Sequence, residues 1–306
     1  MSTSSRKARE GSKTAKGRGP LVARLADFIR LVSSSLPEDA ERALKRALRR
    51  ESKAADSGGS PACTVLKTLL ANVALARRNG TPVCQDTGTL TFFVDECLRR
   101  RVAPAVLGKA VALATEKGWL RRNTIDSLSG RSIDSNVCPG APVVHYIDTC
   151  GSPVLPRGSL ALLMKGGGSE NMSCQFSLPD ADLGAGRDLE GVRRAVLAAV
   201  QRAQGFGCAP GMVGVCIGGD RASGFEEAKL QLLRNLDDVN ADPRLARLER
   251  RILREANSLG IGPMGLGGGT TLLAVKIGAR PRVPASYFVT VAYLCWAARR
   301  RVLDLS

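Results

Sequence analysis

The sequence is poor in several residue types, and each shortage excludes a class of protein or site. It holds a single histidine, His145, and no Cys-x-x-Cys pair, so zinc sites with mixed ligands and a Ser-His-Asp triad are not expected. Aromatic residues make up only 4% of its 306 residues, and no aromatic platform for stacking nucleic-acid bases is visible. The longest apolar run, about residues 287–298, is shorter than the roughly 20 residues that span a bilayer. No apolar stretch follows the N-terminus. We therefore expect a soluble cytoplasmic protein without membrane contact.

Acidic residues are scarce relative to basic ones: 28 Asp and Glu stand against 45 Lys and Arg, a formal charge of +17. The basic residues gather in a tail at 1–19, in a helical cluster at 42–50 and at 299–301. We interpret the two later runs as solvated faces. A basic protein attracts nucleic acid but also small anions, so a dicarboxylate substrate fits equally well. Since no helix-turn-helix or zinc-finger pattern is present, nucleic acid is not the expected partner.

The nine cysteines are an odd number in a chain without an export signal, so a disulfide framework is not expected. With one histidine available, any metal would be held mostly by thiolates, and such sites favour zinc or iron–sulfur clusters.

The hydrophobic pattern predicts a mixed α/β fold. Residues 1–19 lack apolar periodicity and are predicted to be a disordered basic tail. Residues 20–306 are predicted to form one domain, with helices at its N-terminal end and a mixed sheet after them. The predicted helices are about 21–32, 37–54, 61–79, 104–117, 188–204, 224–236 and 243–257. The predicted strands are 90–94, 143–147, 160–164, 212–217, 271–277 and 287–294.

Four segments at the ends of predicted strands are dense in Gly, Cys and polar residues, where functional sites tend to be built. They lie at 81–88, 165–171, 207–220 and 260–297. None has the spacing of a P-loop or a dinucleotide fingerprint. Cys84 is followed by Gln85 and Asp86, which places a soft metal ligand beside an amide and a carboxylate. A single cysteine can equally be an inert small hydrophobe.

Longer stretches of the same segments resemble one family. The stretches are ARRNGTPVCQDTG at 76–88, KGGGSENMS at 165–173, GCAPGMVGVCIGGDRA at 207–222 and GIGPMGLGGGTTLLAVKIG with PASYFVTVAYLCWAARR at 260–300. They are similar, in the same order, to the α-subunits of class I iron–sulfur fumarate hydratases and of L(+)-tartrate dehydratases. The resemblance implies a hydro-lyase that reversibly hydrates fumarate to (S)-malate. It also implies a [4Fe–4S] cluster with one open iron, held by Cys84, Cys208 and Cys295.

The resemblance assigns roles to four further positions and implies a partner. Gln85 and Asp86 would contact the substrate, and Asp86 would relay a proton. Arg121, in the matching segment GWLRRN, would pair with a substrate carboxylate, and Gly168 would offer its backbone to the same anion. Single-chain relatives carry a further domain, so we expect a separate β-subunit to complete the site, in an assembly such as α2β2.

The sequence departs from the family pattern at two places. Val283 stands where the family has a histidine, which indicates another recruited group, a different substrate or impaired turnover. In the 132–139 loop only Asn136 is clearly retained. His145, on an apolar strand, is interpreted as a core histidine, and five of the remaining cysteines as ordinary thiols: Cys63, Cys97, Cys150, Cys174 and Cys216.

Two other functions remain open at this stage. One is the dehydration of L(+)-tartrate or another 2-hydroxy acid. The other, from a different class, is a non-catalytic basic iron–sulfur or nucleic-acid-binding protein.

Overall fold

The computed structural model describes residues 4–54, 60–150, 152 and 154–306, with side chains described from Gly19 onward. Almost all of the predicted tail, residues 1–19, lies before the first residue whose side chain is described. Its disorder therefore stays a prediction. The helices are α1 (Ser4–Ser34), α2 (Glu38–Ala54), α3 (Pro61–Asn79), α4 (Pro104–Glu116), α5 (Gly167–Asn171), α6 (Leu189–Ala203), α7 (Ser223–Gln231) and α8 (Pro243–Ser258), with short 3-10 helices at Glu96–Leu98 and Pro263–Gly265. The strands are β1 (Thr89–Asp95), β2 (Val143–Ile147), β3 (Ser159–Lys165), β4 (Cys174–Ser177), β5 (Gly211–Gly218), β6 (Leu272–Arg280), β7 (Phe288–Leu294) and β8 (Arg300–Asp304).

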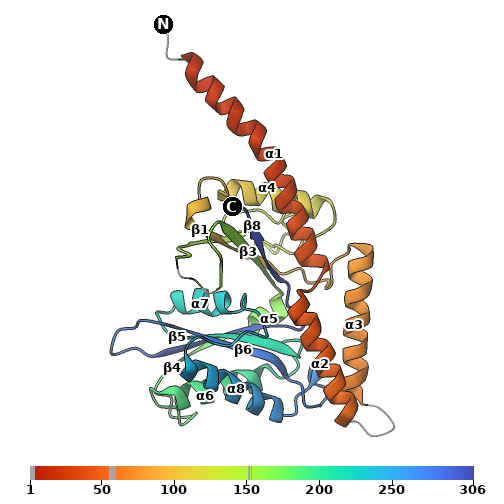
Figure 1. Cartoon of the computed structure of the whole chain (residues 1–306), viewed down its shortest axis with the longest axis vertical. Helices are drawn as coiled ribbons and strands as arrows, with labels where there is room; N and C mark the ends of the chain where they lie inside the picture. The colour runs from red at the N-terminus through yellow and green to blue at the C-terminus, as the bar shows by residue number, and fades with distance from the viewer. Residues whose placement is uncertain (1–3, 55–59, 151, 153) are drawn as a thin grey trace.

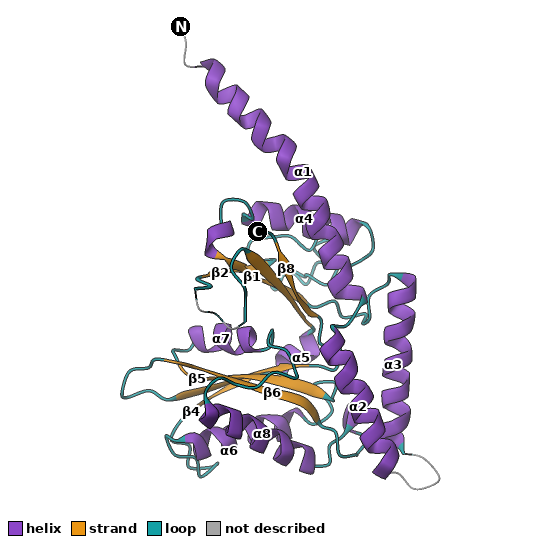
Figure 2. Cartoon of the chain, viewed as in Figure 1, coloured by secondary structure: helices purple, strands orange, loops and turns teal. Residues whose placement is uncertain are grey.

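The mixed α/β class is confirmed, and the strands divide between two mixed sheets of four strands (Figure 2). The first sheet has the order β2-β1-β3-β8, with β1 parallel to β2 and antiparallel to β3. The second has the order β4-β7-β5-β6, with β5 parallel to β6 and antiparallel to β7. The chain passes from the first sheet to the second between β3 and β4, and returns between β7 and β8. Both crossings carry Gly- or Cys-rich motifs, so the junction of the sheets is where those motifs meet.

Helices cover the outer faces of both sheets and fill the space between them (Figure 1). α1 and α4 pack together and bury their apolar faces against β1 and β3. On the second sheet, alternate residues of β5 face opposite sides, as strand geometry requires. Val213 and Val215 pack toward α6 and α8, whereas Met212 and Cys216 pack toward α2, α3 and α7. In the part of the chain that the structure describes, no helix is both long and apolar enough to cross a membrane.

Local signals determine some elements and not others. α3 has both predicted ends, because the Ser60 hydroxyl accepts from the Cys63 N–H and Gly80 ends the helix at a φ of 65°. Strands β4 and β8 were missed: β4 has four residues, and β8 begins with a run of arginines. Both are defined by pairing with strands far away in the sequence.

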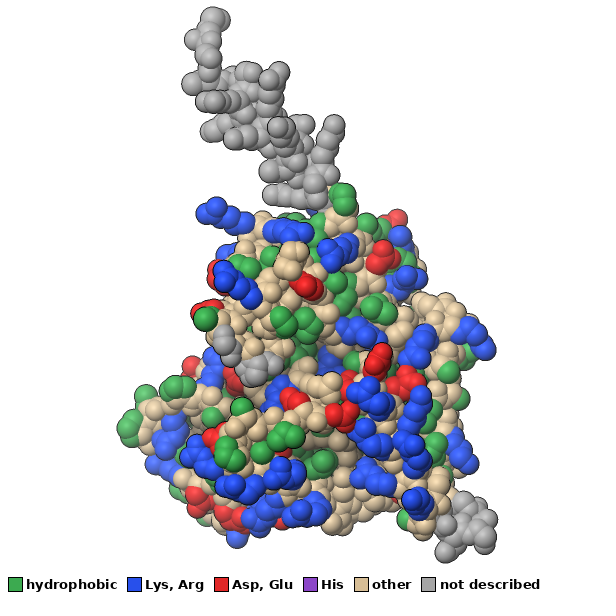
Figure 3. Space-filling model, in the orientation of Figure 1, with side chains coloured by type: hydrophobic (Ala, Val, Ile, Leu, Met, Phe, Trp, Pro, Cys, Tyr) green, Lys and Arg blue, Asp and Glu red, His purple; other side chains and the backbone are tan. Residues whose placement is uncertain are grey.

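The two basic runs have different surroundings. The arginines and lysines of α2 are exposed, as predicted for the 42–50 run, and Figure 3 shows basic side chains gathered over this helix. The prediction of a solvated face at 299–301 was wrong, because Arg299 and Arg300 are 1% and 4% exposed and Arg301 is half-buried. Arg300 is buried because it has a buried partner: its Nη2 lies 2.5 Å from Asp39 Oδ2 and 2.9 Å from the Arg234 carbonyl oxygen.

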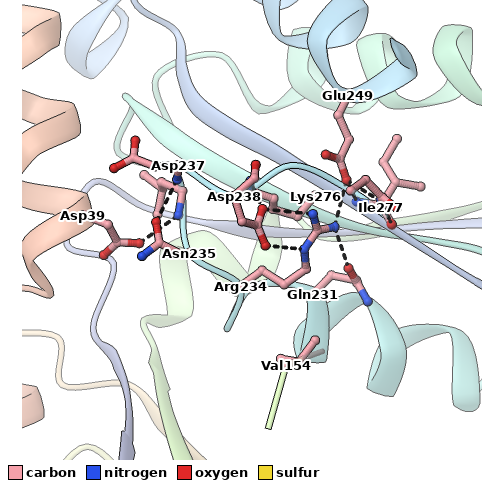
Figure 4. Close-up of polar contacts among 12 residues, drawn as sticks. Asp39, Val154, Gln231, Arg234, Asn235, Asp237, Asp238, Glu249, Lys276 and Ile277 are labelled. Carbon is pink, nitrogen blue, oxygen red and sulfur yellow. Dashed lines mark hydrogen bonds and ion pairs between the residues drawn. The ribbon is translucent and has the colours of Figure 1, made fainter. Parts of the chain in front are cut away.

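The Asp39–Arg300 pair leads into a polar network that joins the two sheets. Arg234 donates to Glu249 and to Asp238 at 2.9 Å each, and Lys276 pairs with Asp238 as well (Figure 4). Glu249 also accepts from the Ile277 N–H at 2.7 Å. The network ties α2, α8, β6 and β8 together across residues that are distant in sequence.

Replacing Asp39 with alanine is expected to destabilise the protein by about 3–5 kcal/mol, because the charge of Arg300 would remain buried without its partner. Burial disfavours the ionised Asp39, but the charge and hydrogen bonds of Arg300 outweigh it and hold the pKa of Asp39 below its ordinary value. The stabilisation is therefore present at neutral pH and is lost as the pH falls through the lowered pKa. Urea unfolding at several pH values measures both effects.

Asp237 provides the matched control for this change. It pairs with Arg42 at 3.1 Å and Arg46 at 2.6 Å on the surface, where both arginines are about half exposed. Asp237→Ala should cost only about 0–1 kcal/mol. An equal loss in the two variants would contradict the importance of the buried pair.

Candidate functional site

The Cys84–Gly88 segment connects α3 to β1 and is fixed at both sides. The Val83 N–H donates to the Ser33 carbonyl at 2.9 Å, and Asn72 donates to the Val83 carbonyl at 2.8 Å. Gly88 has a φ of 71°, and a Cβ there would lie 2.3 Å from the Lys165 carbonyl oxygen. Only glycine fits at this position, because it has no side chain. The backbone of the segment can therefore lie directly against the end of β3.

Asp86 is positioned by two donors at the junction of the sheets. Its Oδ2 accepts from the Gly167 N–H at 2.7 Å, and its Oδ1 accepts from the Asn123 amide at 3.3 Å. Asn123 was not singled out from the sequence, because no local pattern connects it to a carboxylate 37 residues away. These contacts orient the half-buried carboxylate.

Cys208 and Cys295 come together through backbone contacts. Cys208 lies in the loop between α6 and β5 with a φ of 55°, and its carbonyl accepts from the Trp296 N–H at 3.1 Å. A second hydrogen bond fixes the loop, because the Ala209 carbonyl accepts from the Met264 N–H at 2.9 Å. Cys295 directly follows β7 and is buried, whereas Cys208 is exposed and Cys84 is half-buried.

The three thiols are close enough to affect one another electrostatically. Burial raises the pKa of Cys295 to about 11; Arg299 opposes this shift, and Cys208 and Cys84 add to it. Burial also raises the pKa of Cys208, and Cys84 and Asp86 add to that shift. This mutual influence means that Cys84, Cys208 and Cys295 lie within electrostatic range of one another, although 124 and 87 positions separate them in the sequence.

A cavity of about 470 Å³ adjoins Asp86. Its polar lining includes Asn123, Thr124 and Asn136. Asn136 is buried with a φ of 57°, and its side chain accepts from the Asn123 and Thr124 N–H groups at 3.0 Å each. It also donates to the Arg121 carbonyl at 2.7 Å, so this amide shapes the cavity wall by holding the 121–124 segment.

The remaining predicted site residues surround the same place. Gln85 is exposed between Cys84 and Asp86. The Arg121 N–H donates to the Thr87 hydroxyl at 3.3 Å, which fixes its backbone beside the Asp86 segment while its side chain is exposed. Gly168 is exposed in α5, where a Cβ would lie 3.7 Å from the Phe206 carbonyl near Cys208. The structure thus brings the predicted residues to one region at the junction of the sheets.

A buried lysine beside Cys295 was also missed. Lys165 is 1% exposed, pairs with Glu170 at 2.5 Å and donates to the Ser173 hydroxyl at 3.0 Å. Burial lowers its pKa to about 8, although Glu170 opposes the shift. One signal in the sequence could have indicated this buried lysine: it ends an apolar strand and is followed by three glycines.

His145 and Val283 do not join this region through any described contact. His145 stacks on Phe93 with ring centroids 5.1 Å apart and is half-buried on the edge strand β2. Burial lowers its pKa, and its Nδ1 lies 3.8 Å from the Glu226 Oε1, so the histidine predicted for the core is half-buried beside a carboxylate. Val283 is 65% exposed in the β6–β7 connection, at the opposite end of β7 from Cys295.

Comparison with known proteins shows that the sequence of this chain matches a family. The profile of the family described as Fumarate hydratase (Fumerase) matches residues 22–304. A Geobacillus stearothermophilus protein with the provisional name fumarate hydratase class I is 45% identical over 273 residues, which are 88% of this chain and 51% of that protein. The chain therefore spans about half the length of this relative.

Two shorter relatives are matched over nearly their whole length. A Methanocaldococcus jannaschii protein provisionally named L(+)-tartrate dehydratase subunit alpha is 31% identical, over 91% of this chain and 95% of its own. The Escherichia coli K12 L(+)-tartrate dehydratase subunit alpha is 28% identical, over 91% and 88%. The chain belongs to the fumarate hydratase family of hydro-lyases, in the group of class I fumarases and L(+)-tartrate dehydratase alpha subunits.

Proposed function

We propose that this chain is the alpha subunit of an iron–sulfur hydro-lyase that reversibly hydrates fumarate to (S)-malate. The observation that supports the proposal is that Cys84, Cys208 and Cys295 lie within electrostatic range of one another, in a region that also holds Asp86 and its cavity. Fumarate is favoured over tartrate because the relative at 45% identity is named for fumarate, whereas those named for tartrate are at 31% and 28%.

A donor set of three thiols fits a [4Fe–4S] cluster, because cysteine thiolates are the usual ligands of such clusters. In the described residues, no three His, Cys, Asp or Glu side chains lie close enough together to bind one ion. A cluster is larger and takes each thiolate on a different iron, so it accepts cysteines that are more widely spaced. Around Cys295 the chain also places buried donors without partners in the described structure, at Arg299 and Tyr293, which suit a thiolate-bound anionic group.

Cys84, Cys208 and Cys295 would hold the cluster. When bound, such a cluster with three protein thiolates supplies an open iron that acts as a Lewis acid for a hydroxyl and a carboxylate. The chain's own residues would supply the other functions. The Asp86 carboxylate, oriented by Gly167 and Asn123, would hold or release a proton at Oδ1 or Oδ2 as water is added to or lost from the substrate.

Three further groups would bind the dicarboxylate. The exposed Arg121 guanidinium offers two parallel donors to a carboxylate. Gln85 would hydrogen-bond the same substrate from beside Asp86, and Gly168 leaves its backbone accessible because it has no side chain. The net charge of +17 favours the approach of an anionic substrate.

A separate β-subunit is proposed to complete the site, in an assembly such as α2β2. Two observations support it: relatives of similar length are named as alpha subunits, and the relative at 45% identity is about twice as long. The exposure of Cys208, Gln85 and Arg121 leaves room for residues from a partner at this side of the chain.

The proposal is tested by a substrate comparison. The full chain, coexpressed with its β-type partner and reconstituted anaerobically with iron and sulfide, is assayed with fumarate, (S)-malate and L(+)-tartrate. We expect kcat/KM for (S)-malate to exceed that for tartrate by about tenfold or more, because the extra hydroxyl of tartrate must be accommodated. Faster turnover of tartrate would reassign the substrate. A fully loaded complex that turns over none of the three would contradict the proposed activity.

A further inference from the structure

Arg299 is a buried cation without an anionic partner among the described residues. It is 1% exposed, and its Nη2 donates to the neutral Asp86 carbonyl at 2.7 Å. Its Nε and Nη1 are also buried, and neither has a hydrogen-bond partner in the described structure. A guanidinium therefore lies in the interior with two of its nitrogen atoms unpaired.

The other deeply buried arginines show how this chain normally compensates such a charge. Arg300 pairs with Asp39 at 2.5 Å, and Arg234 pairs with Glu249 and Asp238 at 2.9 Å. Burying a charge without a counter-charge is strongly unfavourable, so an unpaired buried arginine indicates that a counter-charge is present in the working protein.

The position of Arg299 indicates where the counter-charge lies. The guanidinium bonds to the Asp86 backbone, two residues from Cys84, and its charge acts on the Cys295 thiol. The Tyr293 hydroxyl is likewise buried without a partner in the described structure, and it lies near Cys295 and Cys208. Two unpaired donors thus border the same group of cysteines. The Asp86 carboxylate also acts on Cys208, but it forms no ion pair with Arg299 among the described residues.

We propose that Arg299 is a positioning residue for the iron–sulfur cluster, whose negative charge its buried guanidinium balances and whose reduction it favours. The inference rests on the proposed function, since it requires the cluster. A [4Fe–4S] core held by three thiolates is a net anion, and one-electron reduction makes it more negative. A nearby fixed cation and N–H donors therefore stabilise the reduced form and raise the reduction potential.

The experiment compares cluster content and reduction potential in the full chain. Arg299→Met and Arg299→Gln remove the charge, Arg299→Lys keeps it, and Arg301→Met serves as a matched control. Arg301 is half-buried two residues away, and its guanidinium donates to the Ser35 and Leu36 carbonyls instead. After anaerobic reconstitution, iron and acid-labile sulfide are measured, and a redox titration is followed by electron paramagnetic resonance of the reduced cluster.

We expect Arg299→Met and Arg299→Gln to disfavour reduction by about tenfold or more, a shift of about 59 mV to lower potential for a one-electron couple. Arg299→Lys should shift the potential less, and Arg301→Met should leave it unchanged. Met and Gln differ in polarity, so one of the two variants can fold where the other does not. The reduction potential is compared with the parent in the variant that retains the parent's circular dichroism spectrum.

The outcomes separate this inference from the proposed function. A parent chain that binds no cluster overturns both. A parent chain that binds the cluster, with neutral variants of unchanged content and potential, overturns the role of Arg299 alone. An equal shift in Arg301→Met would also overturn it, because the effect would then come from general loss of positive charge.

Discussion

Cys295→Ser is expected to remove the cluster while leaving the chain folded. A serine hydroxyl at this buried position replaces a soft thiolate with a poor ligand for iron. Loss of an outer-shell partner alone typically costs 10–100-fold in metal affinity. Loss of a ligand should cost at least as much, so about tenfold less iron and sulfide should be retained. The measurement is iron and sulfide content with the broad visible absorbance after anaerobic reconstitution, and Cys84→Ser and Cys208→Ser should behave in the same way.

Cys216→Ser is the matched control for this series. Cys216 is also buried on the second sheet, but it lies within β5 and its sulfur faces the Gly218 carbonyl at 3.8 Å. The cluster should be retained in this variant. If the three predicted ligands could each be replaced without loss of iron, the proposed cluster site would have to be abandoned.

Asp86→Asn is expected to lower kcat by about 10²–10⁴-fold while the cluster is retained, which is the usual contribution of a positioned acid or base. The amide has nearly the same shape, so it keeps the packing against Gly166 and Gly167, but it cannot exchange a proton at neutral pH. Steady-state kinetics with (S)-malate, together with iron content, measures the effect. The two readings distinguish lost chemistry from a lost cluster.

Asp134→Asn controls for the general removal of an acidic charge near this side of the chain. Asp134 is exposed and pairs with Arg122 at 3.3 Å on the surface. Its kcat should be close to that of the parent. A small effect of Asp86→Asn, similar to that of Asp134→Asn, would assign the proton transfer to another group.

Elements with local signals could be predicted from the sequence, and those that depend on distant partners could not. Ser60, Pro61 and Gly80 define α3 through its own backbone, so both ends were predicted correctly. Nothing local shows that Arg300 begins a strand, because β8 forms by pairing with β3 and its arginine is neutralised by Asp39, 261 residues earlier. The charge pattern therefore predicted a solvated surface where the structure has an interior.

The candidate site follows the same rule. The family motifs predicted Cys84, Cys208, Cys295 and Asp86 as site residues, but each motif alone resembles an ordinary turn. The contact of Asn123 with Asp86 and the burial of Lys165 arise only when the crossings between the two sheets bring the loops together. A buried charge cannot be recognised from sequence, because burial is a property of the tertiary structure.

The bond between Asp39 and Arg300 has one more consequence. Arg299 and Arg300 are neighbours in the chain, and one contacts the Asp86 segment while the other is held by α2. Helix α2 thereby anchors the backbone that carries Arg299, the proposed counter-charge of the cluster. Loosening α2, for example through Asp39→Ala, is therefore expected to lower the iron content of the reconstituted chain as well as its stability.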